Sequence, residues 1–182
     1  AGMMIAIYSG CLIYGMSPDD FAKHPERWMK WMSERRATHS IAPTFAYGIA
    51  AARCGEQLAA SLDLSHLRVV LCGAEPIDSM TLETFGARFA RSGLRQTALF
   101  PCYGLAEATL FVTGGPVGAG VRKIAVDCDK LAEGELVESA SEGATEVVSS
   151  GAVEAGSIVR IARFEEDGQG VALDEGNIGE IC

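Results

Sequence analysis

Short apolar runs alternate with amphipathic stretches along the first 113 residues of the chain. Four runs, at residues 11–16, 37–42, 67–72 and 97–100, have the length of strands and are bounded by Gly, Pro or polar residues, which is typical of buried β-strands. Between them, apolar residues recur three and four positions apart, the spacing of helices that cover a sheet. The pattern therefore predicts an α/β fold, with a mostly parallel sheet flanked by helices over about residues 1–113.

Capping residues predict where three of the helices begin. Ser17, which precedes a proline, is expected to cap the first of them. Thr44 is expected to cap a helix over residues 44–62, and Asp78 a helix over residues 79–90. The apolar positions of the last helix fall on one face, which is expected to be buried; they are Leu82, Phe85 and Phe89.

The character of the chain changes after residue 113. A Gly-rich loop is followed by short apolar segments separated by acidic turns, which is typical of antiparallel β-structure. These segments are residues 122–126, 144–149, 157–162 and 178–182. We therefore expect an α/β subdomain over residues 1–120 and a smaller β-rich part over residues 121–182. The stretch from Asp127 to Ser141 has weak periodicity and many glutamates, so it is interpreted as an exposed insertion.

The net charge of −9 lies entirely in the second part. Residues 1–120 carry ten basic and ten acidic side chains, whereas residues 121–182 carry five and fourteen. This imbalance supports a boundary near residue 120. Basic residues are not clustered anywhere in the sequence, which argues against nucleic acid as a partner.

The six cysteines and three histidines form no metal-binding or disulfide pattern. No pair of cysteines is spaced as CxxC and no pair of histidines as HxxxH. Scattered thiols in a chain of 182 residues are typical of a reduced, cytoplasmic protein. The apolar first 16 residues are interrupted by Ser9-Gly10 and follow no basic segment, so neither a signal peptide nor a membrane span is predicted.

Three motifs directly follow predicted strands of the parallel sheet. They are residues 43–47 (Pro-Thr-Phe-Ala-Tyr), 73–76 (Gly-Ala-Glu-Pro) and 102–107 (Cys-Tyr-Gly-Leu-Ala-Glu). In such sheets ligands bind beyond the carboxyl ends of the strands, so the three motifs together predict one cleft. Pro101 is expected to end the last strand, because proline cannot donate to a sheet ladder. Glu107, which has apolar neighbours on both sides, is expected to be partly buried.

The residue types in these motifs suit a nucleotide. Tyr103 offers a flat aromatic face for a base, and Gly73 and Gly104 allow backbone groups to approach ribose and phosphate closely. Glu107 is a candidate Mg²⁺ ligand, since Mg²⁺ is commonly held by one or two carboxylates plus substrate phosphates. The chain contains no GxxxxGKS/T and no GxGxxG phosphate loop. The structural alternative for this stretch is a strand–turn corner with a satisfied glutamate and no ligand.

The order of the motifs resembles that of the adenylate-forming superfamily. Residues 73–76, then 101–110, then Gly179-Glu180-Ile181 carry this resemblance. Within the superfamily the chain is most similar to fatty acyl-AMP ligases. Residues 43–47 resemble their Pro-Asn-Phe-Ala-Tyr segment, with Thr44 where Asn is usual. The resemblance covers nearly the whole chain, which is thereby identified as a central part of the N-terminal domain of such a ligase.

The resemblance implies an ATP-dependent reaction with Mg²⁺ as cofactor. A fatty carboxylate attacks the α-phosphorus, pyrophosphate leaves and acyl-AMP forms. The acyl group then passes to the phosphopantetheine thiol of an acyl carrier protein. Glu107 would bind Mg²⁺ and be the catalytic residue, and Tyr103 would pack on adenine. The ATP- and acyl-AMP-binding residues that the resemblance implies are Gly73, Ala74, Glu75, Pro76, Cys102, Tyr103, Gly104, Leu105 and Ala106, and the acyl-binding residues are Met3, Met4, Pro43 and Tyr47.

Two features favour an acyl-AMP ligase over other members of the superfamily. Ala106 stands where coenzyme A ligases often carry Thr. Residues of about 121–145 correspond to the insertion of the AMP ligases, which is thought to restrain their mobile C-terminal domain. A long-chain acyl-coenzyme A ligase is the nearest alternative enzyme. A non-catalytic nucleotide-binding or interaction module is an alternative of another class.

Several parts of the implied machinery are not found in the sequence. The chain begins within an apolar pattern and stops where a strand would start, so we expect it to be a piece of a larger ligase, truncated at both ends. The Ser/Thr/Gly-rich phosphate loop, the ribose-binding Asp and the C-terminal Lys of the family would belong to the remaining parts. Because electrostatic stabilisation dominates phosphoryl transfer, the 182 residues alone are expected to be inactive.

Overall fold

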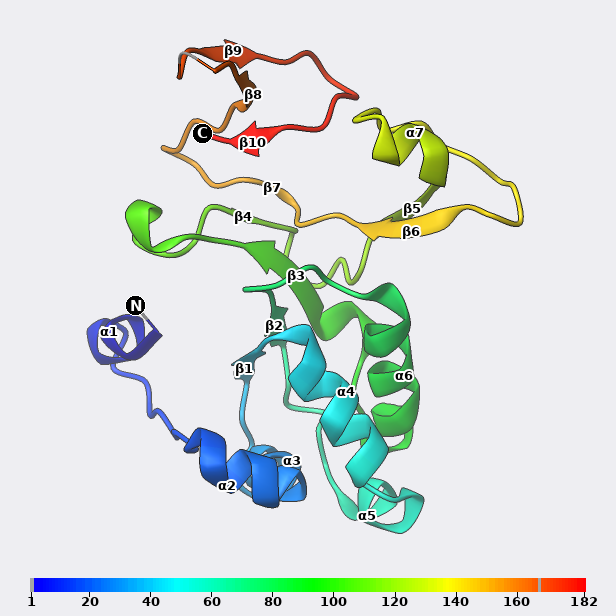
Figure 1. Ribbon diagram of the computed structural model, residues 1–182. Helices are drawn as coiled ribbons and strands as arrows, with labels where there is room; N and C mark the ends of the chain where they lie inside the picture. Colours follow the sequence, from blue (N-terminus) through cyan, green and yellow to red (C-terminus); the bar gives the residue numbers. More distant parts are fainter. Residues whose placement is uncertain (1, 167) are drawn as a thin grey trace.

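The computed structural model describes residues 2–166 and 168–182 of the chain. Helices alternate with strands over the first hundred residues, and short strands dominate after them (Figure 1). The helices are α1 (Gly2–Tyr8), α2 (Pro18–Lys23), α3 (Pro25–Glu34), α4 (Thr44–Arg53), α5 (Glu56–Ser61), α6 (Ser79–Phe89) and α7 (Cys128–Ala132). The strands are β1 (His39–Ala42), β2 (Val69–Cys72), β3 (Leu99–Tyr103), β4 (Thr113–Gly114), β5 (Lys123–Val126), β6 (Thr145–Val148), β7 (Ala152–Val153), β8 (Ile161–Phe164), β9 (Gly170–Ala172) and β10 (Glu180–Ile181).

The central sheet has the strand order β1-β2-β3-β4-β7. Strands β1, β2 and β3 are parallel, and their register aligns Ile41 with Leu71 and Leu71 with Phe100. The predicted α/β fold is thus confirmed, with the difference that the sheet is mixed, because β4 and β7 join it in antiparallel orientation. Since β7 comes from the second predicted part, the two parts share this sheet, and their division at residue 120 stays a prediction.

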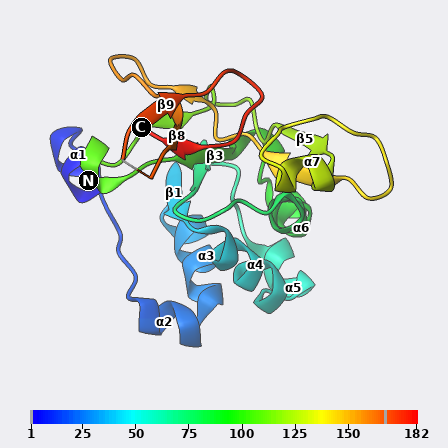
Figure 2. The same ribbon diagram turned by 45° about the horizontal axis from the view of Figure 1, so that its top comes forward.

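Helices α3, α4 and α6 pack on one face of the parallel strands and form the core (Figure 2). Four aromatic rings run through this core, with centroids 5.4 Å apart for Trp28 and Tyr47, 4.9 Å for Tyr47 and Phe85, and 5.0 Å for Phe85 and Phe89. The last three side chains are fully buried. Burial of an aromatic side chain stabilises the fold by about 2 kcal/mol. The row of rings therefore fixes how α4 and α6 lie on the sheet.

The predicted capping residue is present at the start of α6 but not at the start of α4. Asp78 accepts the backbone N–H of Thr81 at 2.7 Å, and α6 begins at the next residue, Ser79. Thr44 is the first residue of α4 and not its cap; it is buried, and its Oγ1 lies 3.3 Å from Sγ of Cys72. The threonine hydroxyl is engaged with the neighbouring strand, so it is not available to cap the helix.

The apolar residues 11–16, predicted as a buried strand, have no regular structure and are largely exposed. Leu12 is 84% exposed. An apolar run becomes a buried strand only where a sheet edge and a covering layer are available. Here the sheet ends at β1, and the segment is not paired with it. Among the helices of the described residues, none is long and apolar enough to cross a membrane.

The β-rich part is antiparallel, as predicted. Strand β5 pairs with β6, and β8 pairs with both β9 and β10. The stretch expected to be an exposed insertion contains α7 and an extended loop, and its residues are half-buried or exposed. Figure 1 shows this part, in yellow to red, at the top of the view: β8, β9 and β10 lie beyond β4 and β7, and the β5–β6 hairpin lies above α6.

Lys123 attaches the β5–β6 hairpin to helix α6. Its Nζ donates to Oε2 of Glu146 on β6, at 2.8 Å, and to the carboxylate of Glu83 on α6. Ser79, at the start of α6, donates its hydroxyl to the same oxygen of Glu146 at 2.5 Å. The hydrogen bonds from Lys123 and Ser79 lower the pKa of Glu146, and the two carboxylates raise the pKa of Lys123. One lysine thus joins the hairpin to the helix that follows β2.

We expect Lys123→Met to loosen this hairpin, because Glu83 and Glu146 would then repel each other without a shared cation. Hydrogen exchange in β5 and β6 should become faster while exchange in α4 stays unchanged. The lowered pKa of Glu146 means that its contribution is present at neutral pH and is lost as the pH falls through that lowered value. The wild-type hairpin should therefore also loosen in acid, once exchange rates are corrected for pH.

The control for charge removal is Lys130→Met, which removes a lysine on α7. Among the described residues, the ion-pair partners of this lysine are Glu133 and Glu135, in its own segment. Equal loosening of the hairpin by both substitutions, measured by hydrogen exchange and mass spectrometry, would contradict the role given to Lys123.

Candidate functional site

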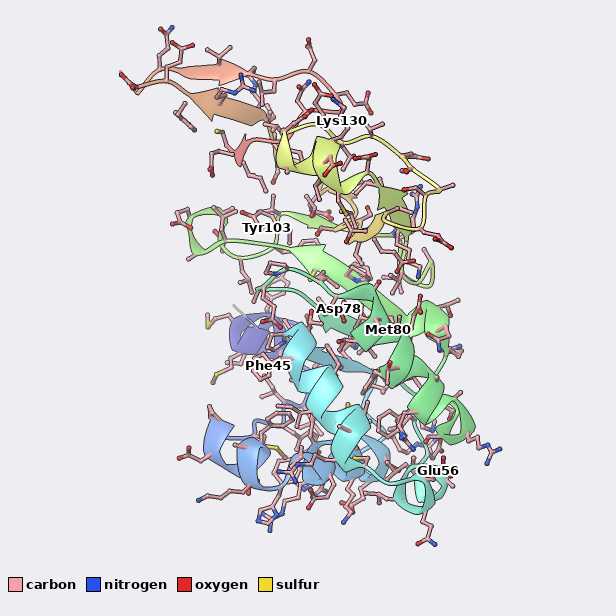
Figure 3. The ribbon with its side chains drawn as sticks, turned by 45° about the vertical axis from the view of Figure 1, so that its right-hand side comes forward. Phe45, Glu56, Asp78, Met80, Tyr103 and Lys130 are labelled. Atoms are coloured by element: carbon pink, nitrogen blue, oxygen red, sulfur yellow. The ribbon has the colours of Figure 1, made fainter. Side chains whose placement is uncertain are left out.

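The three motifs singled out in the sequence lie at one edge of the sheet. Residues 43–47 begin directly after β1 and residues 73–76 directly after β2, while residues 102–107 include the end of β3 and the turn beyond it. Because these strands are parallel, their carboxyl ends meet at the same edge. We call these three segments the rim. In Figure 3, Phe45 at the start of α4 and Tyr103 at the end of β3 both lie toward the left of the view.

Strands β2 and β3 approach each other closely at the rim. Gly73 is buried, and a Cβ atom there would lie 2.5 Å from the backbone oxygen of Cys102, so a side chain could not fit. Ala74 follows in the left-handed region, with a φ of 69°, which costs an L-residue about 1 kcal/mol. The turn that carries residues 73–76 is therefore tight and strained, and Ala74, Glu75 and Pro76 are exposed on it.

Side chains from both neighbours hold the end of β2. On one side, Tyr47 donates its hydroxyl to the backbone oxygen of Leu71 at 2.5 Å, and Thr44 contacts the thiol of Cys72. On the other side, Sγ of Cys102 donates to the backbone oxygen of Cys72 at 3.5 Å. Beyond the strand, Oε1 of Glu75 accepts the backbone N–H of Phe45 at 2.8 Å. The rim segments are thus bonded to one another and not merely adjacent.

Of the four residues expected to line an acyl tunnel, Tyr47 lies away from the surface of the molecule. Tyr47 is fully buried in the aromatic core, and burial raises the pKa of its hydroxyl well above the ordinary value. It has no surface that a ligand could touch, so we withdraw it from the acyl-binding set. Pro43 is half-buried at the rim. Met3 and Met4 are 67% and 69% exposed on α1.

Strand β3 does not end at Pro101 but continues to Tyr103. Pro101 occupies the last pair with β2, opposite Cys72, and Cys102 forms the first pair with β4, opposite Gly114. The missing N–H of the proline falls where the strand changes partners, so no continuous ladder is broken. The extension carries Tyr103 to the rim, where it is half-buried.

The chain folds back sharply between β3 and β4. A Cβ atom at Gly104 would overlap the backbone oxygen of Leu110, which explains why glycine is needed there. Thr109 and Leu110 both have positive φ values, of 60° and 105°, and Leu110 donates its N–H to the backbone oxygen of Leu105 at 2.9 Å. The fold-back presents the short 3₁₀ turn Ala106–Ala108 at its tip.

Glu107 lies in this 3₁₀ turn and is exposed, so the expectation of partial burial was wrong. Its immediate neighbours Ala106 and Ala108 are exposed as well, and Leu110 is 42% exposed. They do not build a pocket, because the fold-back projects away from the core. The carboxylate is consequently open at the rim and able to take a ligand.

A magnesium ion would fit this arrangement only together with oxygen atoms from a ligand. The described part of the chain holds no group of three His, Cys, Asp or Glu side chains that could enclose a metal. Mg²⁺ is commonly bound through one or two carboxylates plus substrate phosphates, and it keeps several waters. A single accessible carboxylate at Glu107 is compatible with that chemistry.

The rim thiols are not nucleophiles. Burial raises the pKa of Cys72 to about 11, an effect that the contact with Thr44 only partly offsets. Burial also raises the pKa of Cys102, which is half-buried. Both thiols are therefore protonated at neutral pH, whereas the reactive form of cysteine is the thiolate.

We expect thiol reagents to distinguish the six cysteines of the folded protein. Cys11, Cys128 and Cys182 are exposed and should be alkylated first at neutral pH. Cys54 and Cys72 are buried and should react only after unfolding. Cys102 should react at an intermediate rate. Mass spectrometry of digested samples measures each site, with urea-unfolded protein as the reference. Alkylation of Cys72 as rapid as that of Cys182 would contradict the structure.

Two features of the structure were not expected from the sequence. Phe45 projects from the rim with 56% of its side chain exposed, although it lies within an apolar stretch. Its position after Pro43, on the face of α4 opposite Tyr47, is a weak signal that could have indicated this.

A cavity of about 240 Å³ lies near the amino end of β3, away from the rim, and its lining includes Glu83, Gln96 and Lys123.

Comparisons with known proteins give a family match and several similar proteins. A family model described as AMP-binding enzyme matches residues 1–182. The chain is 41% identical over 169 residues to a 4-hydroxyphenylalkanoate adenylyltransferase of Mycobacterium tuberculosis, covering 91% of this chain and 26% of the relative. It is 40% identical over 136 residues to a medium-chain-fatty-acid–[acyl-carrier-protein] ligase of Moorena producens, covering 75% of this chain and 23% of that protein.

The fold also matches a solved structure closely. A fatty acyl-adenylate ligase from Legionella pneumophila, in complex with acyl adenylate and pyrophosphate, superposes with a TM-score of 0.87 at 35% identity. The match covers 96% of this chain and 30% of that structure. The chain thus spans less than a third of the length of each of these proteins.

Proposed function

Because the chain belongs to the AMP-binding enzyme family, we propose that it forms the adenylate-binding rim of a fatty acid–AMP ligase. The observation that carries this proposal is the convergence of three loops on one edge, with Tyr103 half-buried and Glu107 exposed in a single fold-back. Support comes from the similarity to a ligase whose structure contains acyl adenylate and pyrophosphate. The proposed enzyme is cytoplasmic, as the scattered free thiols favour.

The proposed reaction activates a fatty acid with ATP. A carboxylate oxygen of the fatty acid forms a bond to the α-phosphorus while the bond between that phosphorus and the pyrophosphate oxygen breaks. The products are acyl-AMP and pyrophosphate. The thiol of a carrier protein then attacks the acyl carbon, AMP leaves, and a thioester forms. The similarity to a ligase named for an acyl carrier protein supports this acceptor.

Different residues of the rim bind different parts of the adenylate. The ring of Tyr103 takes the adenine face, and the exposed turn that begins at Ala74 offers its backbone to the ligand. Glu107 would hold Mg²⁺, which would neutralise charge on the phosphates. The nucleotide-binding set also includes Pro76, Cys102, Gly104, Leu105 and Ala106, and it includes Glu75 as a residue of the turn 73–76. Pro43 is retained as an acyl contact, together with Met3 and Met4.

The proposal is tested in the full-length protein by measuring ATP- and fatty acid-dependent pyrophosphate release and identifying acyl-AMP by mass spectrometry. Glu107→Gln should lower kcat by about 100-fold, because a charge at the reacting phosphates is lost. Tyr103→Ala should raise the KM for ATP by about tenfold, the value of one stacked base. Glu142→Gln, at an exposed glutamate in the insertion region, is the control. Full activity of Glu107→Gln would refute the metal role.

The acyl acceptor separates the proposal from its nearest alternative, a long-chain acyl-coenzyme A ligase. We expect acyl-AMP to form in the absence of any thiol, and a thioester to form with a phosphopantetheinylated carrier protein but not with coenzyme A. Thioester formation is measured by mass spectrometry with each acceptor. Efficient formation of acyl-coenzyme A would favour the alternative. Absence of pyrophosphate release with every fatty acid tested would favour a non-catalytic nucleotide-binding module.

A further inference from the structure

Helix α4 lacks a cap of its own. The first N–H groups of any helix have no partner within the helix and are commonly satisfied by the side chain just before it. Ser17, Asp78 and Asp127 supply such caps for α2, α6 and α7. The residue before α4 is Pro43, whose side chain makes no hydrogen bond. The amino end of α4 therefore needs an acceptor from elsewhere in the fold.

Glu75 provides that acceptor from thirty residues further along the chain. Its Oε1 accepts the N–H of Phe45, the second residue of α4, at 2.8 Å. A carboxylate at the amino end of a helix also interacts favourably with the helix dipole. The hydrogen bond is therefore charge-assisted and stronger than one between neutral groups.

The same bond restrains the turn that contains Glu75. The side-chain bonds of Thr44, Tyr47 and Cys102 hold β2 only as far as Cys72. Between residues 73 and 77, the described part of the chain records no backbone hydrogen bond of the turn or loop kind. Ala74 is strained in the left-handed region, which favours relaxation of the turn. The contact between Glu75 and Phe45 is thus the one recorded side-chain bond that fixes this turn beyond Gly73.

We propose that Glu75 is a positioning residue: its carboxylate caps α4 and thereby holds the Gly73–Ala74 backbone in place at the rim. Its role in the nucleotide site rests on the proposed function, whereas its role as a tether does not. An anionic side chain directed at a triphosphate would repel it. Directed instead at the amino end of α4, the carboxylate acts on the nucleotide only through the backbone that it holds.

The test compares three variants of the full-length protein: Glu75→Ala, Glu75→Gln, and Glu75→Ala combined with Pro43→Ser. In Glu75→Ala, the amide of Phe45 should exchange about fivefold faster, the effect of losing one helix cap. The backbone of Gly73 and Ala74 should become more mobile, which is measured by NMR relaxation of their amides. The KM for ATP should rise by a similar factor, with kcat changed by less than about twofold. Glu75→Gln keeps an oxygen acceptor and should recover most of both effects. Glu142→Ala, at an exposed carboxylate of the insertion region, is the matched control.

The double variant separates helix capping from positioning. Serine at position 43 is a good local cap, so it should restore the slow exchange of Phe45. It cannot restore the tether, so the backbone of Gly73 and Ala74 should stay mobile and the KM for ATP should stay high. The positioning role would be overturned if Pro43→Ser restored the slow exchange of Phe45, the ordered backbone of Gly73 and Ala74, and the low KM for ATP together. Unchanged exchange at Phe45 in Glu75→Ala would also overturn it.

Failure of the proposed function has a different signature. Suppose that the wild-type protein bound no nucleotide, while Glu75→Ala still accelerated exchange at Phe45 and mobilised the backbone of Gly73 and Ala74. The tether would then stand, and the assignment of the rim to a nucleotide would fall. Hydrogen exchange and backbone mobility are both measured without any ligand, so the two results are independent.

Discussion

The parallel pairing of β1, β2 and β3 is the constraint on which the rest of the structure depends. It aligns Ile41, Leu71 and Phe100 across the sheet and so brings three chain-distant carboxyl ends to one edge. Each parallel connection must return across a face of the sheet, and the connecting helices α4 and α6 bury their aromatic side chains there. The core and the rim are therefore two consequences of the same topology. The core fixes the strands, and the strands fix where the loops begin.

The rim combines close backbone approach with local strain. Gly73 lies against Cys102 where no Cβ would fit, and Ala74 follows with a positive φ. Such a turn does not keep its shape by itself, because its own backbone offers few hydrogen bonds. The structure holds it through the side-chain bond between Glu75 and the backbone N–H of Phe45 on α4, while the bond from Cys102 on β3 holds the strand just before the turn. A ligand that meets this edge would find backbone already in position, so little ordering would oppose its binding.

The acidic C-terminal part is connected to the sheet and to the helix that follows the rim turn. Strand β7 extends the central sheet, and Lys123 bonds the β5–β6 hairpin to α6, the helix that begins just after the rim turn of residues 73–76. Ser79 at the start of that helix takes part in the same network. A region that the sequence marked as separate by its charge is thus joined to the α/β part by backbone pairing and by one cation shared between two carboxylates.

The sequence by itself determined the features that depend on near neighbours. These include the alternation of strands and helices, the cap at Asp78, the buried face of α6, and the three motifs after strands, because periodicity, caps and turns are set by residues a few positions apart. The tertiary structure decided what depends on packing. Residues 11–16 are not paired with the sheet, Tyr47 is buried in the core and not on a ligand surface, and Glu107 is exposed to solvent. The bond between Glu75 and Phe45 joins residues thirty positions apart, and only the parallel register brings them within reach.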